Sequence, residues 1–168
     1  GVAMTPENRK KEGIVEALSV HANLCLASLK AIARGHLLSK KREKPFVAEP
    51  IGKLGIKVAD PRNLISSLSG GNQQKVVVGK WLAAGPRVLI MDEPTRGIDV
   101  GSKAEIHRII RKLADQGTCL LFISSEVPEI LRVSDRVLVM SGGRIVAEFG
   151  RGASQEQVLQ RILQGEAT

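Results

Sequence analysis

The chain has 168 residues, 43% of them hydrophobic, which is enough to bury the core of one domain and excludes a disordered chain. Aromatic residues make up only 2%, so there is little material for a nucleic-acid platform of stacked rings. The formal net charge of +8 favours an anionic partner: nucleotide phosphates, nucleic acid or acidic lipid headgroups.

The first segment, from Gly1 to about Lys44, opens with the charged turn "TPENRKKEG" and continues into a predicted helix. In "SVHANLCLASLKAIARG" the apolar residues recur at helical spacing, and Ser19 is a candidate N-cap. The segment ends in the basic run "KKREK", which we interpret as a solvated surface in preference to a patch for nucleic acid or lipid.

Between Pro45 and Leu68 the chain contains three prolines, and glycines at positions 52 and 55. These residues break regular structure, so turns with only short helices are expected. We interpret residues 1–68 as a helical or signalling subdomain that ends in this connector.

From Ser69 onward, strand and helix patterns alternate through residues 69–168. The expected elements are helices over about 72–84 and 102–116, strands over about 88–91 and 118–124, a short helix opened by Pro128, a hairpin turned at Gly142 and Gly143, and a last helix capped by Ser154 with Gln157 in the capping-box position.

Two of these strands, "VLIM" and "CLLFI", are continuously apolar, which predicts burial on both faces. That pattern is typical of a parallel sheet covered by helices. The predicted fold is therefore α/β: a helical subdomain plus a mostly parallel sheet flanked by helices, with a β-hairpin and a helix at the C-terminal end.

The cysteines, the histidines and the hydropathy pattern indicate no disulfide, no metal site and no membrane span. Cys25 and Cys119 lie far apart inside apolar runs, which predicts reduced core thiols of a cytosolic protein. His21, His36 and His107 do not have the spacing of a metal site. No apolar run approaches the ~20 residues of a membrane span, and no leader with a basic start and an apolar middle is expected.

Three carboxylates follow the strand "VLIM". Asp92 and Glu93 come directly after it, where the carboxyl ends of parallel strands form a ligand crevice. Neighbouring strand residues point to opposite sides, so Asp92 suits a magnesium ion and Glu93 suits an attacking water as general base. Asp99 either caps the next helix or takes part in the same site.

The stretch "LSGGNQQK" combines the features that bind an anion at the start of a helix. Ser69 offers a hydroxyl, and Gly70 and Gly71 let the backbone approach a phosphate closely. Gln73 and Gln74 are expected to bond neighbouring loops. Lys75 is expected to add positive charge.

In this order, "LSGGNQQK", "VLIMDEPT" and "GIDV" resemble the signature motif, Walker B strand and D-loop of ATP-binding-cassette (ABC) ATPases. The likeness covers nearly the whole chain. "TPENRKKEG", "PTRGIDVGSK" and "ISSEVPEI" narrow it to the second nucleotide-binding domain of bacterial importers for ribose, galactose or xylose. The resemblance implies part of a P-loop NTPase (ABC ATPase) domain, with ATP and Mg²⁺ as cofactors.

The family's roles transfer to individual positions. The resemblance implies that the start of the signature helix contacts the γ-phosphate of ATP held by the opposite domain, through Ser69, Gly70 and Gly71. It places Gln73 at the same nucleotide-binding site. It makes Asp92 the residue that organises Mg²⁺ and Glu93 the catalytic carboxylate. It also implies that Asp99 crosses the domain interface.

Three departures from the family pattern accompany these matches. Glu7 stands where most relatives have a glutamine that senses magnesium and the membrane subunit. Ser125 stands at the position of the histidine that contacts γ-phosphate, so less charge stabilisation is expected in the transition state. No Gly-rich loop ending in Gly-Lys-Ser/Thr is present, so the chain alone is expected to bind ATP poorly in a fluorescent-nucleotide titration and not to hydrolyse it.

The implied function is an ATPase module that powers sugar import, peripheral at the cytoplasmic face of the bacterial inner membrane. Its expected partners are the first nucleotide-binding domain of the same polypeptide, membrane permease subunits and, indirectly, a periplasmic sugar-binding protein, with no nucleic acid. Two alternatives stay open: an ABC half that closes on nucleotide without turnover, and a nucleic-acid-associated ABC ATPase whose binding falls steeply with salt.

Overall fold

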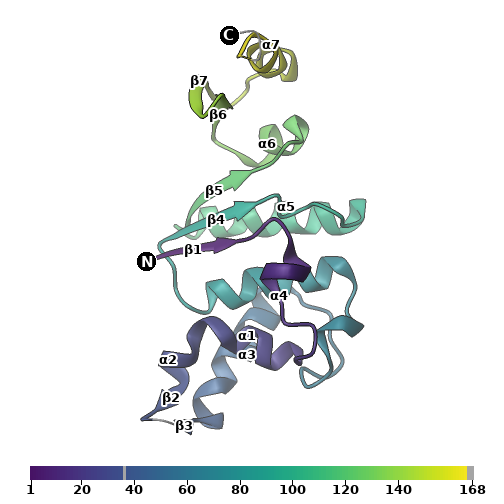
Figure 1. The fold of residues 1–168 in the computed structure, drawn as a ribbon, viewed down its shortest axis with the longest axis vertical. Coiled ribbons are helices and arrows are strands. Elements are labelled where there is room, and N and C mark those ends of the chain that lie inside the picture. Colours follow the sequence, from purple (N-terminus) through teal and green to yellow (C-terminus); the bar gives the residue numbers. More distant parts are fainter. Residues whose placement is uncertain (36, 166–168) are drawn as a thin grey trace. The chain divides into compact units, whose positions relative to one another are not determined.

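The computed structural model describes residues 1–35 and 37–165 of the chain (Figure 1). It divides into two compact units, Gly1–Leu121 and Phe122–Thr168. The first unit includes residues on both sides of the predicted boundary at residue 68. The assignment of residues 1–68 to a signalling subdomain stays a prediction.

The sheet has the strand order β1-β4-β5, with β1 at Val2–Thr5, β4 at Val88–Asp92 and β5 at Cys119–Ile123. β1 runs parallel to β4, with Val2 opposite Val88 and Thr5 opposite Met91. The predicted α/β fold with a parallel sheet is confirmed. Strand β1 was not predicted, because a run of four residues is too short to show a strand pattern in the sequence. In the structure its side chains alternate, with Val2 and Met4 exposed.

The expectation that both apolar strands are buried on both faces is wrong for "CLLFI". In β4, Leu89 and Met91 are fully buried, and Val88, Ile90 and Asp92 are partly buried. In β5, Leu121 is 48% exposed and Ile123 is 42% exposed. The physical reason is position: β5 is last in the strand order, so it lacks a second neighbour among the described strands.

Helix α4, Gly70–Leu82, is the central helix of the first unit. It packs against β1, against α5 at Val100–Asp115, and against α1 (Val20–Cys25) and α3 (Lys40–Leu54), so it lies between the sheet and the helices α1 and α3 (Figure 1). Its valines Val76, Val77 and Val78 are completely buried. Because α4 is buried on all sides, the position of its N-terminus is fixed by packing. This N-terminus, called the front of α4 below, carries the Ser69–Gly71 turn of the motif "LSGGNQQK".

The helical region before α4 differs from the prediction in two ways. Its first part consists of several short helices and strands, and its later part forms one long helix. Ser19 caps α1, Val20–Cys25, and its hydroxyl oxygen accepts a hydrogen bond from the Ala22 amide at 3.1 Å, as predicted. The charged turn before it forms the short π-helix η1, Arg9–Gly13. After α1 come a 3-10 turn (Leu26–Ser28), α2 (Leu29–Ile32), β2 (Ala33–Arg34) and β3 (Leu37–Leu38).

The expected connector is instead the 15-residue helix α3, Lys40–Leu54, which contains Pro45 and Pro50. The prediction of only short helices here is wrong, because tertiary packing outweighs the lost amide donors. A Cβ placed on Gly79 of α4 would lie 3.0 Å from the Pro50 side chain and 3.2 Å from that of Leu54. Proline therefore serves as a packing surface for α4 in this helix. The last 3-10 turn, η3 at Ile65–Ser67, leads into the front of α4.

The second unit contains α6 (Val127–Val133), β6 (Arg136–Ser141), β7 (Arg144–Gly150) and α7 (Gln155–Gly165). The predicted hairpin turn is confirmed, with φ of +54° at Gly142 and +77° at Gly143. The predicted capping box is also confirmed: the Gln157 amide donates to the Ser154 hydroxyl and the Ser154 amide donates to the Gln157 side chain.

The cysteine prediction holds for one residue of the pair. Cys25 is buried, and burial, with a smaller contribution from Glu43, raises the pKa of its thiol to about 11. Cys119 is exposed, so its assignment to the core is wrong, because it begins the outer strand β5. His36 lies outside the described residues. Within the described ranges no helix is long and apolar enough to cross a membrane.

Candidate nucleotide-contact site

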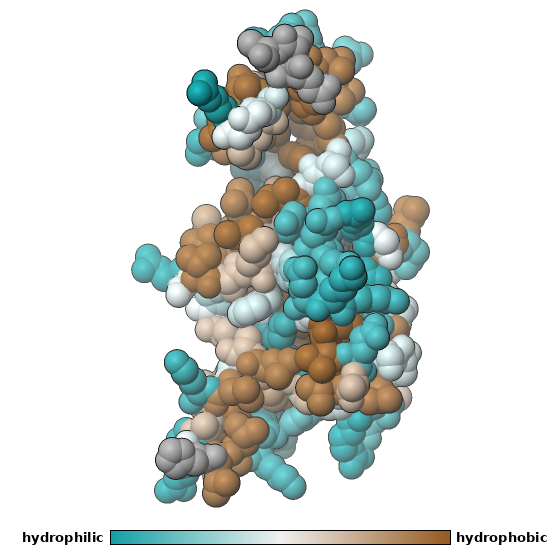
Figure 2. Space-filling view, viewed as in Figure 1, coloured by the Kyte–Doolittle hydropathy of each residue, from teal (hydrophilic) through white to brown (hydrophobic). Residues whose placement is uncertain are grey.

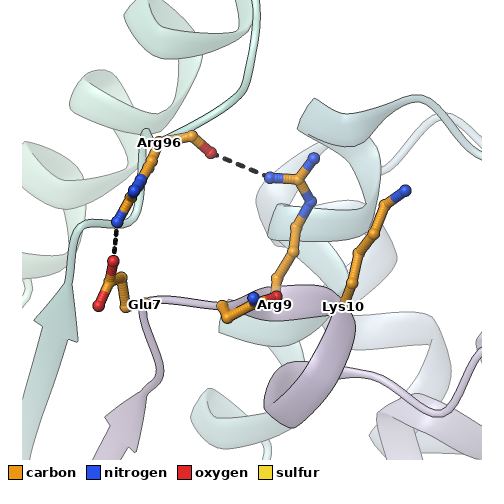
Figure 3. A pocket seen from close by; sticks show the side chains of 5 residues that line it. Glu7, Arg9, Lys10 and Arg96 are labelled. Carbon is orange, nitrogen blue, oxygen red and sulfur yellow. Dashed lines mark hydrogen bonds and ion pairs between the residues drawn. The ribbon is translucent and has the colours of Figure 1, made fainter.

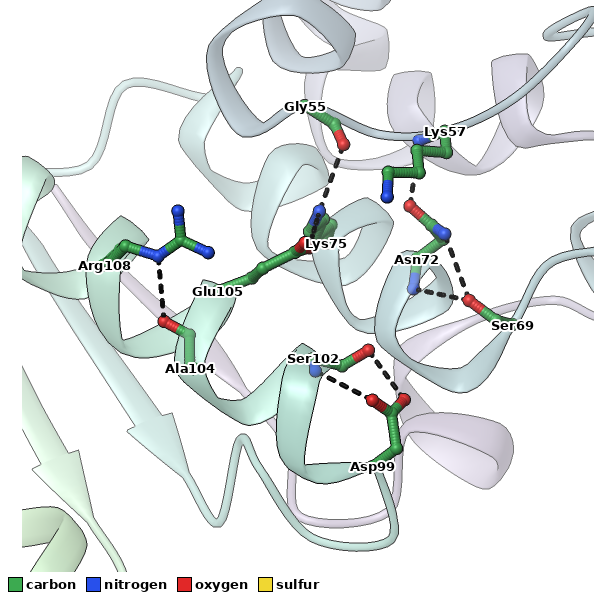
Figure 4. Close-up of polar contacts among 10 residues, drawn as sticks. All are labelled: Gly55, Lys57, Ser69, Asn72, Lys75, Asp99, Ser102, Ala104, Glu105 and Arg108. Carbon is green, nitrogen blue, oxygen red and sulfur yellow. Dashed lines mark hydrogen bonds and ion pairs between the residues drawn. The ribbon is translucent and has the colours of Figure 1, made fainter.

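Helix α4 begins at Gly70, two residues before the predicted helix start near Asn72, and Ser69 is its N-cap. The Ser69 hydroxyl oxygen accepts hydrogen bonds from the Asn72 amide at 3.5 Å and from the Asn72 side-chain nitrogen at 3.0 Å (Figure 4). Asn72 is held in turn by the Lys57 amide, which donates to its side-chain oxygen at 2.8 Å. The exposed Ser69 hydroxyl thus keeps its own proton for an outside acceptor.

Gly70 and Gly71 differ in what surrounds them. A Cβ on Gly71 would lie 2.2 Å from the Ser102 hydroxyl oxygen and 2.5 Å from the Ser102 Cβ, so no side chain fits there. A Cβ on Gly70 would meet the end of the flexible Arg9 side chain at 2.7 Å, which can move aside. Gly71 is therefore required for the close approach of α4 to α5.

Asp99 is the N-cap of α5, the more ordinary of the two interpretations open at the sequence level. One carboxylate oxygen accepts from the Ser102 amide at 2.9 Å and the other from the Ser102 hydroxyl at 2.7 Å (Figure 4). These bonds, the amide first, hold the pKa of the Asp99 carboxyl below its usual value. Since Gly71 touches Ser102, the positive ends of α4 and α5 meet at this point.

Asp92 and Glu93 lie at the carboxyl end of β4, as predicted, and both are half-buried. Glu93 has φ of +42°, a left-handed backbone that non-glycine residues rarely adopt. Its carbonyl accepts a hydrogen bond from the Arg96 amide at 3.1 Å, which closes the turn through Pro94. Backbone strain of this kind is concentrated at functional sites.

A pocket of about 310 Å³ lies beside this turn, lined by Glu7, Asn8, Arg9, Lys10 and Arg96 (Figure 3). Glu7 forms an ion pair with Arg96. Arg9 donates to the carbonyl oxygens of Arg96 at 3.0 Å and Gly97 at 3.3 Å. Arg9 and Arg96 were not predicted as site residues, because 87 residues separate them in the sequence and no local signal joins them.

Two residues of the motif "LSGGNQQK", Gln73 and Lys75, bond to neighbouring segments of the fold. Gln73 bonds a neighbouring loop as predicted, donating to the carbonyls of Ile65 at 3.3 Å and Leu68 at 3.2 Å. Lys75 does not add charge to the front of the helix, and that prediction is wrong. Its buried side chain instead donates to the Gly55 carbonyl at 3.1 Å and to the Glu105 carboxylate at 2.6 Å.

Ser125, the last of the predicted site residues, follows β5 and belongs to the unit Phe122–Thr168. The others, from Glu7 to Asp99, belong to the unit Gly1–Leu121. Within that unit the structure brings together Ser69, Gly70, Gly71 and Asp99 at the two helix starts.

Replacing Lys75 by methionine is expected to lower the free energy of unfolding by about 1–2 kcal/mol, since the change leaves the Gly55 carbonyl and Glu105 without their donor. Lys75 lowers the pKa of Glu105, chiefly through the hydrogen bond. The pair therefore stabilises the fold above the ordinary carboxyl pKa, and this contribution is lost as the pH falls through the lowered value.

Urea unfolding of the chain from neutral to acid pH measures this effect, with Glu105→Gln as the control that cannot titrate. The stability difference between the parent chain and Glu105→Gln should shrink as the pH falls. A difference that stays constant over this pH range would contradict the assignment.

The structure thus combines a parallel sheet, the Ser69-capped helix α4 and two carboxylates at the end of β4. The family model described as "ABC transporter" matches residues 2–96, and the chain belongs to this family. A solved structure of the ATP-binding cassette MJ0796, a dimer in a post-hydrolysis state bound to ADP and Pi, has a TM-score of 0.72 to this chain. That likeness covers 90% of this chain and 64% of the other at 21% identity, and it confirms the fold.

Curated relatives are more similar in sequence. Ribose import ATP-binding protein RbsA 2 of Streptomyces avermitilis is 47% identical over 167 residues, which are 99% of this chain and 33% of the relative. Ribose import ATP-binding protein RbsA of Geobacillus kaustophilus is 45% identical over 165 residues, 98% of this chain and 33% of the relative. The chain thus spans about a third of the length of the curated relatives it matches.

Proposed function

We propose that this chain supplies one side of an ATP site in the ATP-binding subunit of a bacterial sugar importer. The observation that carries the proposal is the junction of Gly71 with Ser102, where the Ser69-capped start of α4 meets the Asp99-capped start of α5. The names of the relatives, which are ribose import ATP-binding proteins, support the substrate class.

At the front of α4 the first-turn amides have no partner within the helix, and Ser69 retains a hydroxyl proton. These groups would donate to the terminal phosphate of an ATP whose main cradle lies on a partner domain, the first nucleotide-binding domain of the same polypeptide. The absence of a side chain at Gly70 would let the phosphate approach the backbone once the Arg9 side chain moves aside. In this arrangement the chain acts as a clamp on the partner's nucleotide.

The carboxylates at the end of β4, Asp92 and Glu93, would act at the ATP site on this chain's own side of the domain interface. Hard carboxylate oxygens suit Mg²⁺, so Asp92 fits as its ligand, and the bound ion would neutralise charge on the phosphate oxygens. Glu93 would accept the proton of the attacking water. Ser125 would stand at the family's histidine position, where an uncharged hydroxyl stabilises the transition state less.

The permease subunits would contact this module at the cytoplasmic face of the membrane, with the sugar-binding protein on the other side. Glu7 occupies the position expected to sense the membrane subunit, and its ion pair with Arg96 joins the loop after β1 to the loop after β4. A shift of one loop would therefore displace the other. This supports a route from the permease contact to the catalytic carboxylates.

A second candidate function is an ABC half that closes on nucleotide without turnover, favoured by the serine at position 125. It predicts that Glu93→Gln leaves the ATP turnover of the assembled importer unchanged. A large loss of turnover would favour the catalytic function.

Variants of Asp99 test the proposed contact across the domain interface. Asp99→Ser keeps an N-cap oxygen for the Ser102 amide, so the melting temperature should stay near that of the parent protein, whereas Asp99→Ala should lower it. Both variants lose the carboxylate, and both should lower ATP turnover of the assembled importer about tenfold. Full turnover with Asp99→Ser would mean that Asp99 only caps α5.

A further inference from the structure

The end of the helical region that carries β2 and β3 exposes apolar side chains. Leu37 is 77% exposed, Leu38 is 56% exposed and Leu29, at the start of α2, is 41% exposed. Figure 2 shows brown, hydrophobic residues gathered at this end, in the lower left, with teal side chains projecting beside them. We call residues 29–35 and 37–44 the basic tip.

The basic tip carries a dense positive charge next to these leucines. Its single acidic residue, Glu43, lies 3.4 Å from His21. Six basic residues are exposed: Lys30, Arg34, Lys40, Lys41, Arg42 and Lys44. Three of them lie in the first turn of α3, where cations oppose the helix dipole, so helix stability does not explain them.

Backbone and side-chain bonds hold the leucines and the cations together. The Arg42 guanidinium donates to the Ala33 carbonyl in β2 at 3.0 Å. The Ser39 amide, between β3 and α3, donates to the Ile32 carbonyl at 3.4 Å. The hairpin and the first turn of α3 therefore form one surface that is both apolar and basic.

We propose that the basic tip binds a membrane surface that contains anionic lipid, independently of the proposed ATPase function. Lysine and arginine attract anionic headgroups, each strengthening binding about fivefold near the surface. Exposed leucines enter the boundary between headgroups and acyl chains. A nucleic acid would use the cations but gain little from two leucines, because single-strand binding uses stacked aromatic rings. The leucines thus revise the interpretation of "KKREK" as only a solvated surface.

The experiment measures partitioning of the 168-residue chain onto vesicles of phosphatidylcholine, with and without about a third phosphatidylglycerol. Binding to the mixed vesicles is expected, with at least tenfold weaker binding to phosphatidylcholine alone and release at high salt. Equal binding to both kinds of vesicle, or binding to neither, would overturn the proposal. Binding to single-stranded RNA but not to vesicles would also overturn it and assign the tip to nucleic acid.

Matched variants locate the surface. Lys40→Glu/Lys41→Glu should weaken binding to mixed vesicles at least tenfold, whereas Lys53→Glu/Lys112→Glu, with the same change in net charge at exposed lysines elsewhere, should weaken it much less. The same effect from both pairs would refute a localised site.

A second pair of variants tests the leucines. Leu37→Ser/Leu38→Ser should weaken binding about tenfold. The control is Met140→Ser/Ile145→Ser, which alters residues 66% and 60% exposed on the β6–β7 hairpin and should have little effect. If Leu37→Ser/Leu38→Ser does not weaken vesicle binding, charge alone drives the binding, which contradicts the proposal.

Discussion

Gly71→Ala is expected to abolish most ATP turnover of the proposed importer assembly and to destabilise the chain by about 1–3 kcal/mol. The added methyl group would lie 2.5 Å from the Ser102 Cβ, which no rotation of the serine side chain relieves. The two helices must therefore separate, and the amides at the front of α4 move with them. Turnover and urea unfolding measure the two effects, and we expect at least a tenfold loss of turnover.

Two controls distinguish this packing effect from a general intolerance of the motif. Gly70→Ala meets mainly the end of the Arg9 side chain, so it should cost much less stability. Adding Ser102→Gly to Gly71→Ala leaves the Ser102 Cα, at 3.8 Å, as the nearest atom at that residue, and should restore most of the lost stability. Equal losses for both glycine variants, with no rescue, would contradict the assigned contact.

Glu93→Gln is expected to lower ATP turnover by about 10² to 10⁴-fold while nucleotide still binds, because the amide does not accept the proton of the attacking water. The two side chains have nearly the same shape, so folding should change little. Steady-state turnover and nucleotide binding on the same preparation separate the two effects. Equal losses of binding and turnover would contradict a role as general base.

Glu93→Gly provides a second, structural check on the same residue. The φ of +42° at Glu93 is costly for a residue with a Cβ and not for glycine. The free energy of unfolding of Glu93→Gly should therefore be at least that of Glu93→Gln, with a gain of up to about 1 kcal/mol, and we expect Glu93→Gly to be inactive as well. A glycine variant clearly less stable than Glu93→Gln would mean that the left-handed backbone carries no strain.

Local signals predicted much of this fold. Ser19 and Ser154 were identified as helix caps, and Gly142 with Gly143 as a hairpin turn, because each of these structures depends on residues within a few positions. The carboxylates after β4 were placed correctly for the same reason: a short apolar run followed by charge marks the end of a buried strand.

Contacts between distant segments were not predictable in this way. Helix α3 contains two prolines and still forms, because Pro50 packs against Gly79 of α4. Lys75 was expected to add positive charge to the motif, but its side chain donates to Glu105, 30 residues away. The link from Arg9 to Arg96 likewise depends on the pairing of β1 with β4, which brings their following loops together.

The most direct test of the proposed clamp is a structure of the assembled importer carrying Glu93→Gln and trapped with ATP. We expect the Ser69 hydroxyl and the Gly71 amide within about 3 Å of an oxygen of the terminal phosphate of an ATP held by the partner domain. A Ser69–Gly71 turn that points away from every bound triphosphate would contradict the proposal.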